Sequence, residues 1–324
     1  MDLRQYYICM NFTNYFMKQK ILLFVIAVAT SIVEMQDLNA QNAYGGISVG
    51  YGMPLGGQDI YNETSTSTYN SDPFGGNTTS NSEYTSDRMQ LSFGKGIQAN
   101  AMVGYMMNPN LGFELGLSYL LGGKTEEIYE YSSSSIFTDG SRSSSSGLET
   151  RTYSARMFRV NPSVVISTGG ELLSPYAKFG VIVGSGTMTI DYLNEETDTY
   201  SDLFGSDSEV YTEEYTYELS SGYAVGMSGA VGVMSKGASG ISFFGELFME
   251  NVKYAPKKGE YTVYKEDGLN LLSLLTTSET ETEFVDNYTS SSTDVESESK
   301  PSQERRESYA FGNVGVRMGV MINF

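Results

Sequence analysis

The chain has 324 residues and a formal net charge of −19, with 39 acidic and 20 basic side chains. A chain this acidic will not bind nucleic acid or anionic lipid head groups through a general electrostatic patch. It contains no histidine and its one cysteine is Cys9, so imidazole bases and a disulfide within the chain are excluded.

The N-terminal residues have the pattern of a secretory signal peptide. Lys18 and Lys20 precede a twelve-residue apolar run, Ile21–Ile32, and polar residues then lead to the small residue Ala40. The apolar run is too short to cross a bilayer as a helix. We therefore expect cleavage after Ala40 and export of the rest of the chain. A buried core helix is the alternative interpretation of this run.

Translation can start at either of two methionines, Met1 or Met17. Met17 begins a conventional signal of its own, so residues 1–16 read as an upstream extension. We expect residues 1–40 to be this extension plus a cleaved signal peptide, and residues 41–324 to form one domain. Because Cys9 lies upstream of the cleavage site, the mature domain has no thiol for a metal site or a nucleophile.

Eight segments of the expected domain alternate between apolar residues and small or polar ones, which is the period of a β-strand. In the last segment, Val314, Val316 and Met318 share one face, opposite glycines, amides and Arg317. A wholly apolar face of this kind fits a strand whose outer side meets lipid. The eight segments are 47–53, 97–105, 111–122, 153–167, 175–189, 217–234, 241–249 and 309–324.

The connections between these segments alternate strictly in length. Three are a few residues long, and the other four are 55–95, 123–152, 190–216 and 253–307. Short periplasmic turns and long outer loops are typical of outer-membrane barrels, and soluble sandwiches follow no such rule. We therefore predict an all-β fold, an eight-stranded antiparallel up-and-down transmembrane β-barrel with four long extracellular loops. A soluble all-β domain is the alternative.

The predicted inward faces carry a set of charges. An eight-stranded barrel leaves a lumen just wide enough for side chains, so buried charges there must be paired. We expect a structural network of salt bridges with a net charge of about +1; an ion path or an acid–base site is the alternative. Glu114 and Lys178 are expected near the turns, and the other three near the middle. The five residues are Glu114, Arg159, Lys178, Glu246 and Arg317.

The long connections are rich in Ser, Thr, Tyr, Asp and Glu, which predicts mobile, solvated loops. Alternating residues at 187–192 and 211–218 indicate that some strands extend beyond the membrane. Such ribbons offer an edge to which a foreign strand can pair. The acidic side chains are also candidates for binding calcium, although no EF-hand or nonapeptide spacing appears.

Three features resemble the outer-membrane-protein β-barrel family. They are Pro175-Tyr176-Ala177-Lys178-Phe179-Gly180, Ala255-Pro256-Lys257-Lys258-Gly259 and the terminal Phe324. The resemblance covers about 41–324 and is to the eight-stranded OmpA- and OmpX-like group, in a Bacteroidetes-type form. It implies a location in the cell outer membrane, in contact with its lipid. It also implies that Phe324 is the C-terminal signal read by the barrel assembly machinery.

The expected function is a structural or surface-interaction role carried by the long acidic loops, with a surface ligand or divalent cations as partners. A narrow pore or a conduit for small hydrophobic molecules is the alternative, and an enzyme of the outer leaflet is the third hypothesis. Without a histidine we find no recognisable triad, so we expect no enzyme, no catalytic or metal residues and no cofactor. We also expect a monomer that binds no nucleic acid.

Overall fold

The computed structural model describes residues 43–70, 79–170, 172–237, 240–287 and 298–324. The predicted signal peptide lies outside these ranges. The described residues form one sheet of seventeen strands, and the only helices among them are η3 (Leu272–Leu274) and α2 (Thr277–Thr280). The all-β prediction is confirmed, but the count of eight strands is wrong for the sheet as a whole.

The strands are β1 (Ala43–Pro54), β2 (Gln58–Asn70), β3 (Thr79–Leu91), β4 (Gly96–Asn108), β5 (Leu111–Gly122), β6 (Thr125–Ile136), β7 (Arg142–Ser167), β8 (Leu173–Ser201), β9 (Ser206–Ser220), β10 (Tyr223–Lys236), β11 (Ile241–Ala255), β12 (Lys258–Glu266), β13 (Leu269–Asn270), β14 (Glu281–Val285), β15 (Ser302–Arg305), β16 (Tyr309–Ala310) and β17 (Asn313–Asn323).

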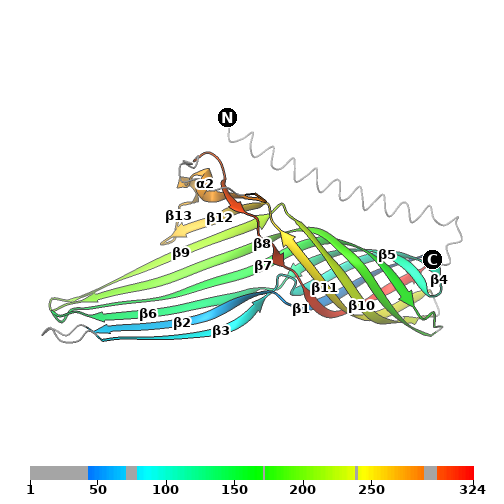
Figure 1. Cartoon of the computed structure of the whole chain (residues 1–324), viewed down its shortest axis with the longest axis horizontal. Coiled ribbons are helices and arrows are strands. Elements are labelled where there is room, and N and C mark those ends of the chain that lie inside the picture. The colour runs from blue at the N-terminus through cyan, green and yellow to red at the C-terminus, as the bar shows by residue number, and fades with distance from the viewer. Residues whose placement is uncertain (1–42, 71–78, 171, 238–239, 288–297) are drawn as a thin grey trace.

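Eight of these strands pair in a closed antiparallel ring (Figure 1). The order around the ring is β1, β4, β5, β7, β8, β10, β11 and β17, and β17 then pairs with β1. Each of the eight predicted segments supplies one of these strands. Because the ring closes on itself, its strands have no free edge along the closure.

The extra strands come from the long connections, which are mostly strand where loops were expected. Their Thr, Tyr and Val residues favour extended backbone, and neighbouring strands satisfy their backbone groups. The predicted segment 217–234 is in fact two strands, since β9 ends at Ser220 and β10 starts at Tyr223. Ser221 between them has φ +62°, a left-handed conformation that interrupts a strand.

Most of this added structure forms a second, open region that we call the projecting sheet. It comprises β2, β3, β6, β9 and β12 with the outer parts of β7 (142–153) and β8 (190–201), and it extends away from one end of the ring (Figure 1). The order is β3–β2–β6–β7–β8–β9–β12, and only β2 and β6 are parallel. β8 has 29 residues, so it is about 95 Å long at about 3.3 Å per residue.

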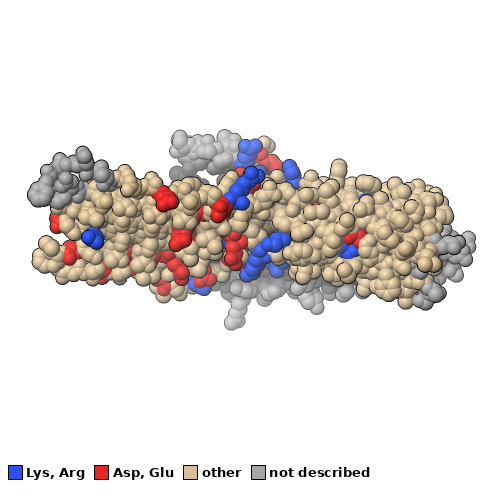
Figure 2. Space-filling model, turned by 90° about the horizontal axis from the view of Figure 1, so that it is seen from below, with Lys and Arg blue, Asp and Glu red and all other residues tan. Residues whose placement is uncertain are grey.

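The ring has its apolar side chains outside and its polar ones inside. Met227 is 73% exposed and Met318 is 69% exposed, whereas Arg159 is 1% exposed and Gln98 is fully buried. On the face of the molecule that Figure 2 shows, Lys, Arg, Asp and Glu gather over the projecting sheet and its junction, and the ring is almost free of them. This is the reverse of the arrangement in a water-soluble protein.

The fourth long connection folds back beside the junction of ring and projecting sheet (Figure 1). β12 pairs with β9, β13 and β14, and β15 continues this sheet in parallel with β14. Helix α2 begins with a capping box formed by Thr276 and Glu279. In the part of the chain that the structure describes, no helix has the length and apolarity needed to span a membrane.

Closure of the ring can be tested by cross-linking its first and last strands. Val49 of β1 lies opposite Met318 of β17, and opposed Cβ atoms in such pairs are about 4.5–5.5 Å apart. With Cys9 replaced by serine, the pair Val49→Cys and Met318→Cys should cross-link efficiently with a short bifunctional maleimide, seen as a gel shift. The pair Val49→Cys and Val231→Cys, on strands that do not pair, should not. Equal cross-linking of both pairs would contradict the closed ring.

Candidate functional site

Six charged side chains meet inside the ring and form one unbranched chain of ion pairs. They include all five charged residues predicted to face inward. Lys178 Nζ lies 2.9 Å from Glu114 and 3.4 Å from Glu246, and Arg317 lies 2.8 Å from Glu246. Glu250 completes the chain at 3.2 Å from Arg317 and 2.6 Å from Arg159. The order is therefore Glu114, Lys178, Glu246, Arg317, Glu250 and Arg159.

Glu250 was missed because the predicted strand ended at Met249, the residue before it, whereas β11 continues to Ala255. Continuing the alternation from Glu246 through Phe248 puts Glu250 on the same inward face, and it is 4% exposed at the side chain. With Glu250, three carboxylates balance three cations, so the network is neutral and the expected net charge of +1 is wrong. The sequence predicts Glu114 and Lys178 near the turns and the other three charges near the middle. Lys178 connects these two groups, because it contacts both Glu114 and Glu246.

Neutral groups complete the solvation of these charges. The Tyr44 hydroxyl donates to Glu114 and the Tyr176 hydroxyl to Glu246, each at 2.9 Å. Glu250 accepts further bonds from the amides of Gln98 at 3.1 Å and Asn313 at 3.2 Å. The Arg317 guanidinium also lies 4.4 Å from the centre of the Phe248 ring, a cation–π distance.

Apolar layers enclose the charges on both sides. Toward the short turns lies a cluster made of Tyr44, Met102, Val165, Tyr176, Phe244 and Met321. Toward the projecting sheet lies a larger cluster that includes Leu120, Met157, Ile182, Val252, Tyr254 and Phe311. The cavity between these layers, beside Ser48 and Arg317, has a volume of only about 30 Å³. That is about the volume of one water molecule, so this arrangement is suited to a plug and not to a path for ions.

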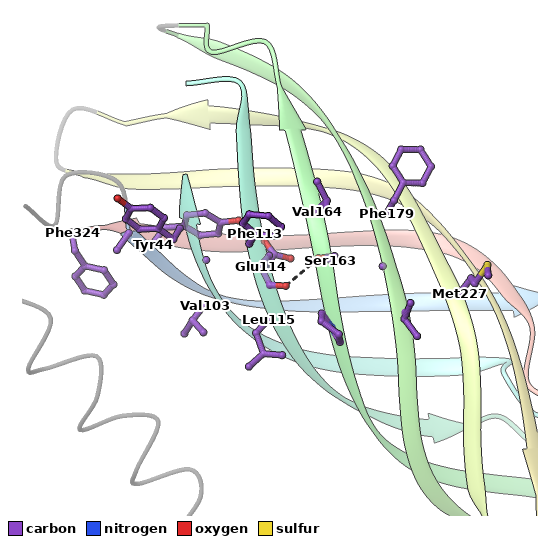
Figure 3. A pocket seen from close by; sticks show the side chains of 16 residues that line it. Tyr44, Val103, Phe113, Glu114, Leu115, Ser163, Val164, Phe179, Met227 and Phe324 are labelled. Carbon is purple, nitrogen blue, oxygen red and sulfur yellow. Dashed lines mark hydrogen bonds between the residues drawn. The ribbon is translucent and has the colours of Figure 1, made fainter. Parts of the chain in front are cut away.

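The Phe324 ring is 49% exposed at the turn end of the ring, and its backbone N–H donates to Ala43. Near it, a cavity of about 900 Å³ lies against the wall (Figure 3). Outward side chains such as Val103, Phe113 and Phe179 line it, together with inward Glu114. A second cavity of about 360 Å³ reaches from the turns to Lys178.

The wall beside the larger cavity is locally weakened. The pairing of β7 with β8 skips Asn161 and Pro162, which stand between the pairs Val160–Val183 and Ser163–Gly180. Proline has no backbone N–H to donate to a neighbouring strand. Pro162 also lines the cavity, so the cavity lies at the place where β7 and β8 skip their pairing.

The projecting sheet has one face that we call the tyrosine face, and it continues the inward side of the ring. The register aligns Tyr153, Ile190, Tyr217 and Tyr261 in one row across four strands. Thirteen tyrosines lie on this face and none on the opposite face, among the described residues of the sheet. They are Tyr61, Tyr69, Tyr84, Tyr129, Tyr131, Tyr153, Tyr192, Tyr200, Tyr211, Tyr215, Tyr217, Tyr261 and Tyr264.

Neighbouring tyrosines on this face pack against one another. The rings of Tyr192 and Tyr215 stack with centroids 4.4 Å apart, and Tyr261 meets Tyr217 at 4.7 Å. The Tyr131 ring packs directly over Gly147 of the neighbouring strand. A Cβ at position 147 would lie about 2.4 Å from that ring, so only glycine leaves room for it. Side-chain packing therefore holds this face in place, although its outer end is open to solvent.

Three tyrosines of this face, Tyr131, Tyr215 and Tyr217, remain neutral hydrogen-bonding groups well above neutral pH. Burial raises the pKa of Tyr215 and of Tyr217 to about 12. Burial is the larger cause and a hydrogen bond to Glu196 the second cause that raise the pKa of Tyr131 to about 12. Burial and the nearby Glu266 also raise the pKa of Glu213 above its usual value. The face was not singled out from the sequence, although Tyr129/Tyr131 and Tyr215/Tyr217 already show the two-residue spacing of a shared face.

No protein-family model and no curated protein matches the sequence. Solved structures that resemble it include that of Ail, the attachment invasion locus protein of Yersinia pestis, in complex with the heparin analogue sucrose octasulfate. The sequences are 11% identical, the match covers 87% of this chain and 97% of Ail, and the TM-score is 0.24. The two architectures superpose poorly at this score, so the functional assignment depends on the geometry of the ring and the projecting sheet alone.

Removing Glu250 should test whether the charges depend on one another. Glu250→Ala leaves Arg159 buried without its carboxylate, which should cost about 3–5 kcal/mol of the free energy of unfolding. Glu260→Ala removes an exposed carboxylate from β12 and should change it by about 0.5 kcal/mol or less. Urea unfolding in lipid vesicles, followed by circular dichroism, measures both. Equal stability of the two variants would show that Glu250 does not hold the network.

Proposed function

We propose that the ring is the membrane-spanning barrel of an integral outer-membrane protein whose role is surface interaction through the projecting sheet. The observation that carries this proposal is the exposed apolar girdle around a closed ring with neutralised charges inside. The girdle includes Ile47, Val49, Ile97, Phe113, Leu121, Phe158, Phe179, Val181, Val225, Met227, Val231, Phe243, Leu247, Val316 and Met318, each at least 39% exposed.

The physics of a bilayer supports this assignment. No water in the hydrocarbon core can bind the N–H and C=O groups of a strand, so a spanning sheet must close on itself. The pairing of β17 with β1 supplies that closure. In water the same girdle would be an apolar surface far larger than monomeric soluble proteins expose. The eight-stranded barrel expected from the sequence is thus the ring, surrounded by outer-membrane lipid.

Aromatic residues near the ends of the ring strands fit an interfacial belt. Tyr105, Tyr119 and Tyr223 are 45%, 42% and 65% exposed on the outer side. Tyrosine is favoured where the hydrocarbon meets the head groups, because its ring is apolar and its hydroxyl is polar. The short turns would then face the periplasm and the projecting sheet the cell exterior. The export signal expected within residues 1–40 and recognition of Phe324 by the barrel assembly machinery belong to the same proposal.

Surface interaction is the role that the projecting sheet supports best. The sheet extends far beyond the ring, presents side chains on both faces and ends in the open edge strand β3, which pairs only with β2 among the described strands. We propose that it carries no catalytic site and needs no cofactor. No group of three or more Cys, Asp or Glu side chains among the described residues is placed to hold a metal ion.

A conduit for small hydrophobic molecules is the second candidate. It is favoured by the cavity of about 900 Å³ against the wall and by the pairs that β7 and β8 skip at Pro162. A molecule entering there would still meet the charged layer between Lys178 and Arg159. The conduit would therefore have to open sideways into the membrane at the turn end and not run through the barrel.

Arginine substitutions at two exposed leucines test the membrane assignment directly. Leu247 lies on the girdle and is 60% exposed, and Leu193 lies on the projecting sheet and is 38% exposed. Leu247→Arg should lower the free energy of unfolding in lipid by about 2–4 kcal/mol, because its charge meets hydrocarbon. Leu193→Arg should change it by about 0.5 kcal/mol or less, because its charge meets water. The same small effect at both positions would rule out a membrane around the ring.

The enclosed charges predict that the barrel does not conduct. Refolded protein in a planar bilayer should give no stable single-channel current, because the layers on both sides of Lys178 and Arg159 leave no continuous water path. A wide porin in the same bilayer serves as the control for detection. A reproducible unitary conductance from the wild-type protein would favour a pore instead.

A further inference from the structure

The tyrosine face carries negative charge that its own cations do not balance. Ten carboxylates lie on it among the described residues, against two arginines, Arg88 and Arg151. Arg88 is paired with Asp59 at 2.9 Å, and Arg151 with Glu149 at 2.5 Å. The carboxylates are Asp59, Glu63, Glu127, Glu149, Glu196, Asp198, Asp207, Glu209, Glu213 and Glu266.

Arg151 shows how this face accommodates a guanidinium. Glu149 and Glu127 lie at 2.5 Å and 3.9 Å from its nitrogens, and the Tyr192 ring lies 5.7 Å from its central carbon. A carboxylate supplies the charge and the hydrogen bond, and a tyrosine ring supplies the cation–π contact. Elsewhere on the face a tyrosine lies opposite a carboxylate without an arginine, in the pairs Glu196–Tyr211 and Tyr200–Asp207.

Tyrosine hydroxyls hold several of these carboxylates in place. Tyr153 donates to Glu127 at 2.7 Å, Tyr264 donates to Glu266 at 2.8 Å, and Tyr84 donates to Glu63. Such bonds fix the carboxylate oxygens without neutralising them. A cationic partner would therefore meet charges that are already positioned, which lowers the entropy lost on binding.

The size of the face fits a macromolecule and not a small ligand. Twelve residues of β7 beyond the ring extend about 40 Å, and seven strands at about 4.8 Å spacing span about 29 Å. The resulting area, about 1,150 Å², is enough for what one partner buries in a standard protein interface. At its base, cavities of about 510 Å³ and 330 Å³ lie on either side of Ile190 and Tyr309 and can receive side chains of a bound chain.

We propose that the tyrosine face is a docking surface for an extended polypeptide rich in arginine and lysine. This inference rests on the proposed function and names the chemical class of its partner. Guanidinium and ammonium groups would pair with the free carboxylates, and their stems would lie on the tyrosine rings, as Arg151 does on Tyr192. Nucleic acid, sulfated polysaccharide and a second copy of this acidic face would all be repelled.

The test uses the mature protein in nanodiscs of zwitterionic lipid. The probe is a fluorescein-labelled peptide of alternating arginine and serine, about twelve residues long so that it matches the face. The control peptide has citrulline in place of arginine, which keeps the shape and removes the charge. Fluorescence anisotropy should show saturable binding of the arginine peptide, weakening as salt is raised, and no binding of the citrulline peptide.

Adjacent glutamates on the same strands provide a matched pair of protein variants. Glu127, Glu196 and Glu213 lie on the tyrosine face, whereas Glu126, Glu195 and Glu214 lie on the opposite face, which is also acidic but has no tyrosine. Replacing the first three by glutamine should weaken binding about ten-fold or more. Replacing the second three, with the same change in net charge, should weaken it by about two-fold or less.

A third variant separates the tyrosines from the charge. Changing Tyr129, Tyr200 and Tyr211 to threonine keeps every carboxylate and should still weaken binding about five-fold. Heat-dependent gel migration confirms the folded barrel in each variant before binding is measured. Three results would each overturn the proposed basic partner. They are equal losses of peptide affinity in both glutamate variants, an unchanged peptide affinity in the tyrosine variant, and no binding of the arginine peptide to the wild-type protein. The Leu247→Arg result would be unaffected, so failure here is distinct from failure of the proposed function.

Discussion

The whole architecture depends on the antiparallel pairing of β17 with β1, which closes the ring. The register of this pairing continues from Tyr44 opposite Asn323 to Pro54 opposite Asn313, so both strands are bonded along nearly their full length. Without it, β1 and β17 would each present a row of unpaired backbone groups along one edge. Closure also creates the interior of the ring. It brings side chains from different strands close enough for the six buried charges to pair with one another.

The interior shows how such charges are held at low cost. An isolated ion in a low-dielectric interior is destabilising by several kcal/mol, and each of the six has at least one opposite charge within 3.4 Å. Tyr44, Tyr176, Gln98 and Asn313 supply further hydrogen bonds. Replacing a buried ion pair by well-packed apolar residues can be neutral or stabilising, whereas loss of one member leaves its partner charge uncompensated, so the network is weak evidence of net stability.

Alternation and connection length were enough to predict all eight ring strands and five of the six buried charges, because a period of two assigns each residue to a face. Glu250 was missed because the predicted segment ended at Met249, whereas β11 continues to Ala255. The projecting sheet was only partly foreseen, since Ser- and Thr-rich segments such as 132–135 have a composition typical of loops. Their strand pairing, including the parallel contact of Glu63 with Tyr129, depends on residues distant in sequence. The tyrosine face emerges only once that pairing is known.

The unbroken continuity of β7 and β8 from the ring into the projecting sheet has a mechanical consequence. Both strands cross the junction in one register, paired at every residue from Val160 opposite Val183 to Arg142 opposite Ser201, and the skipped pairs at Asn161 and Pro162 lie within the ring. A load applied to the outer end of the projecting sheet and directed away from the ring would act along the strand axes. The interstrand hydrogen bonds lie perpendicular to that axis, so many would bear the load in shear at once instead of opening one by one. The junction between the ring and the projecting sheet is thus built to resist tension.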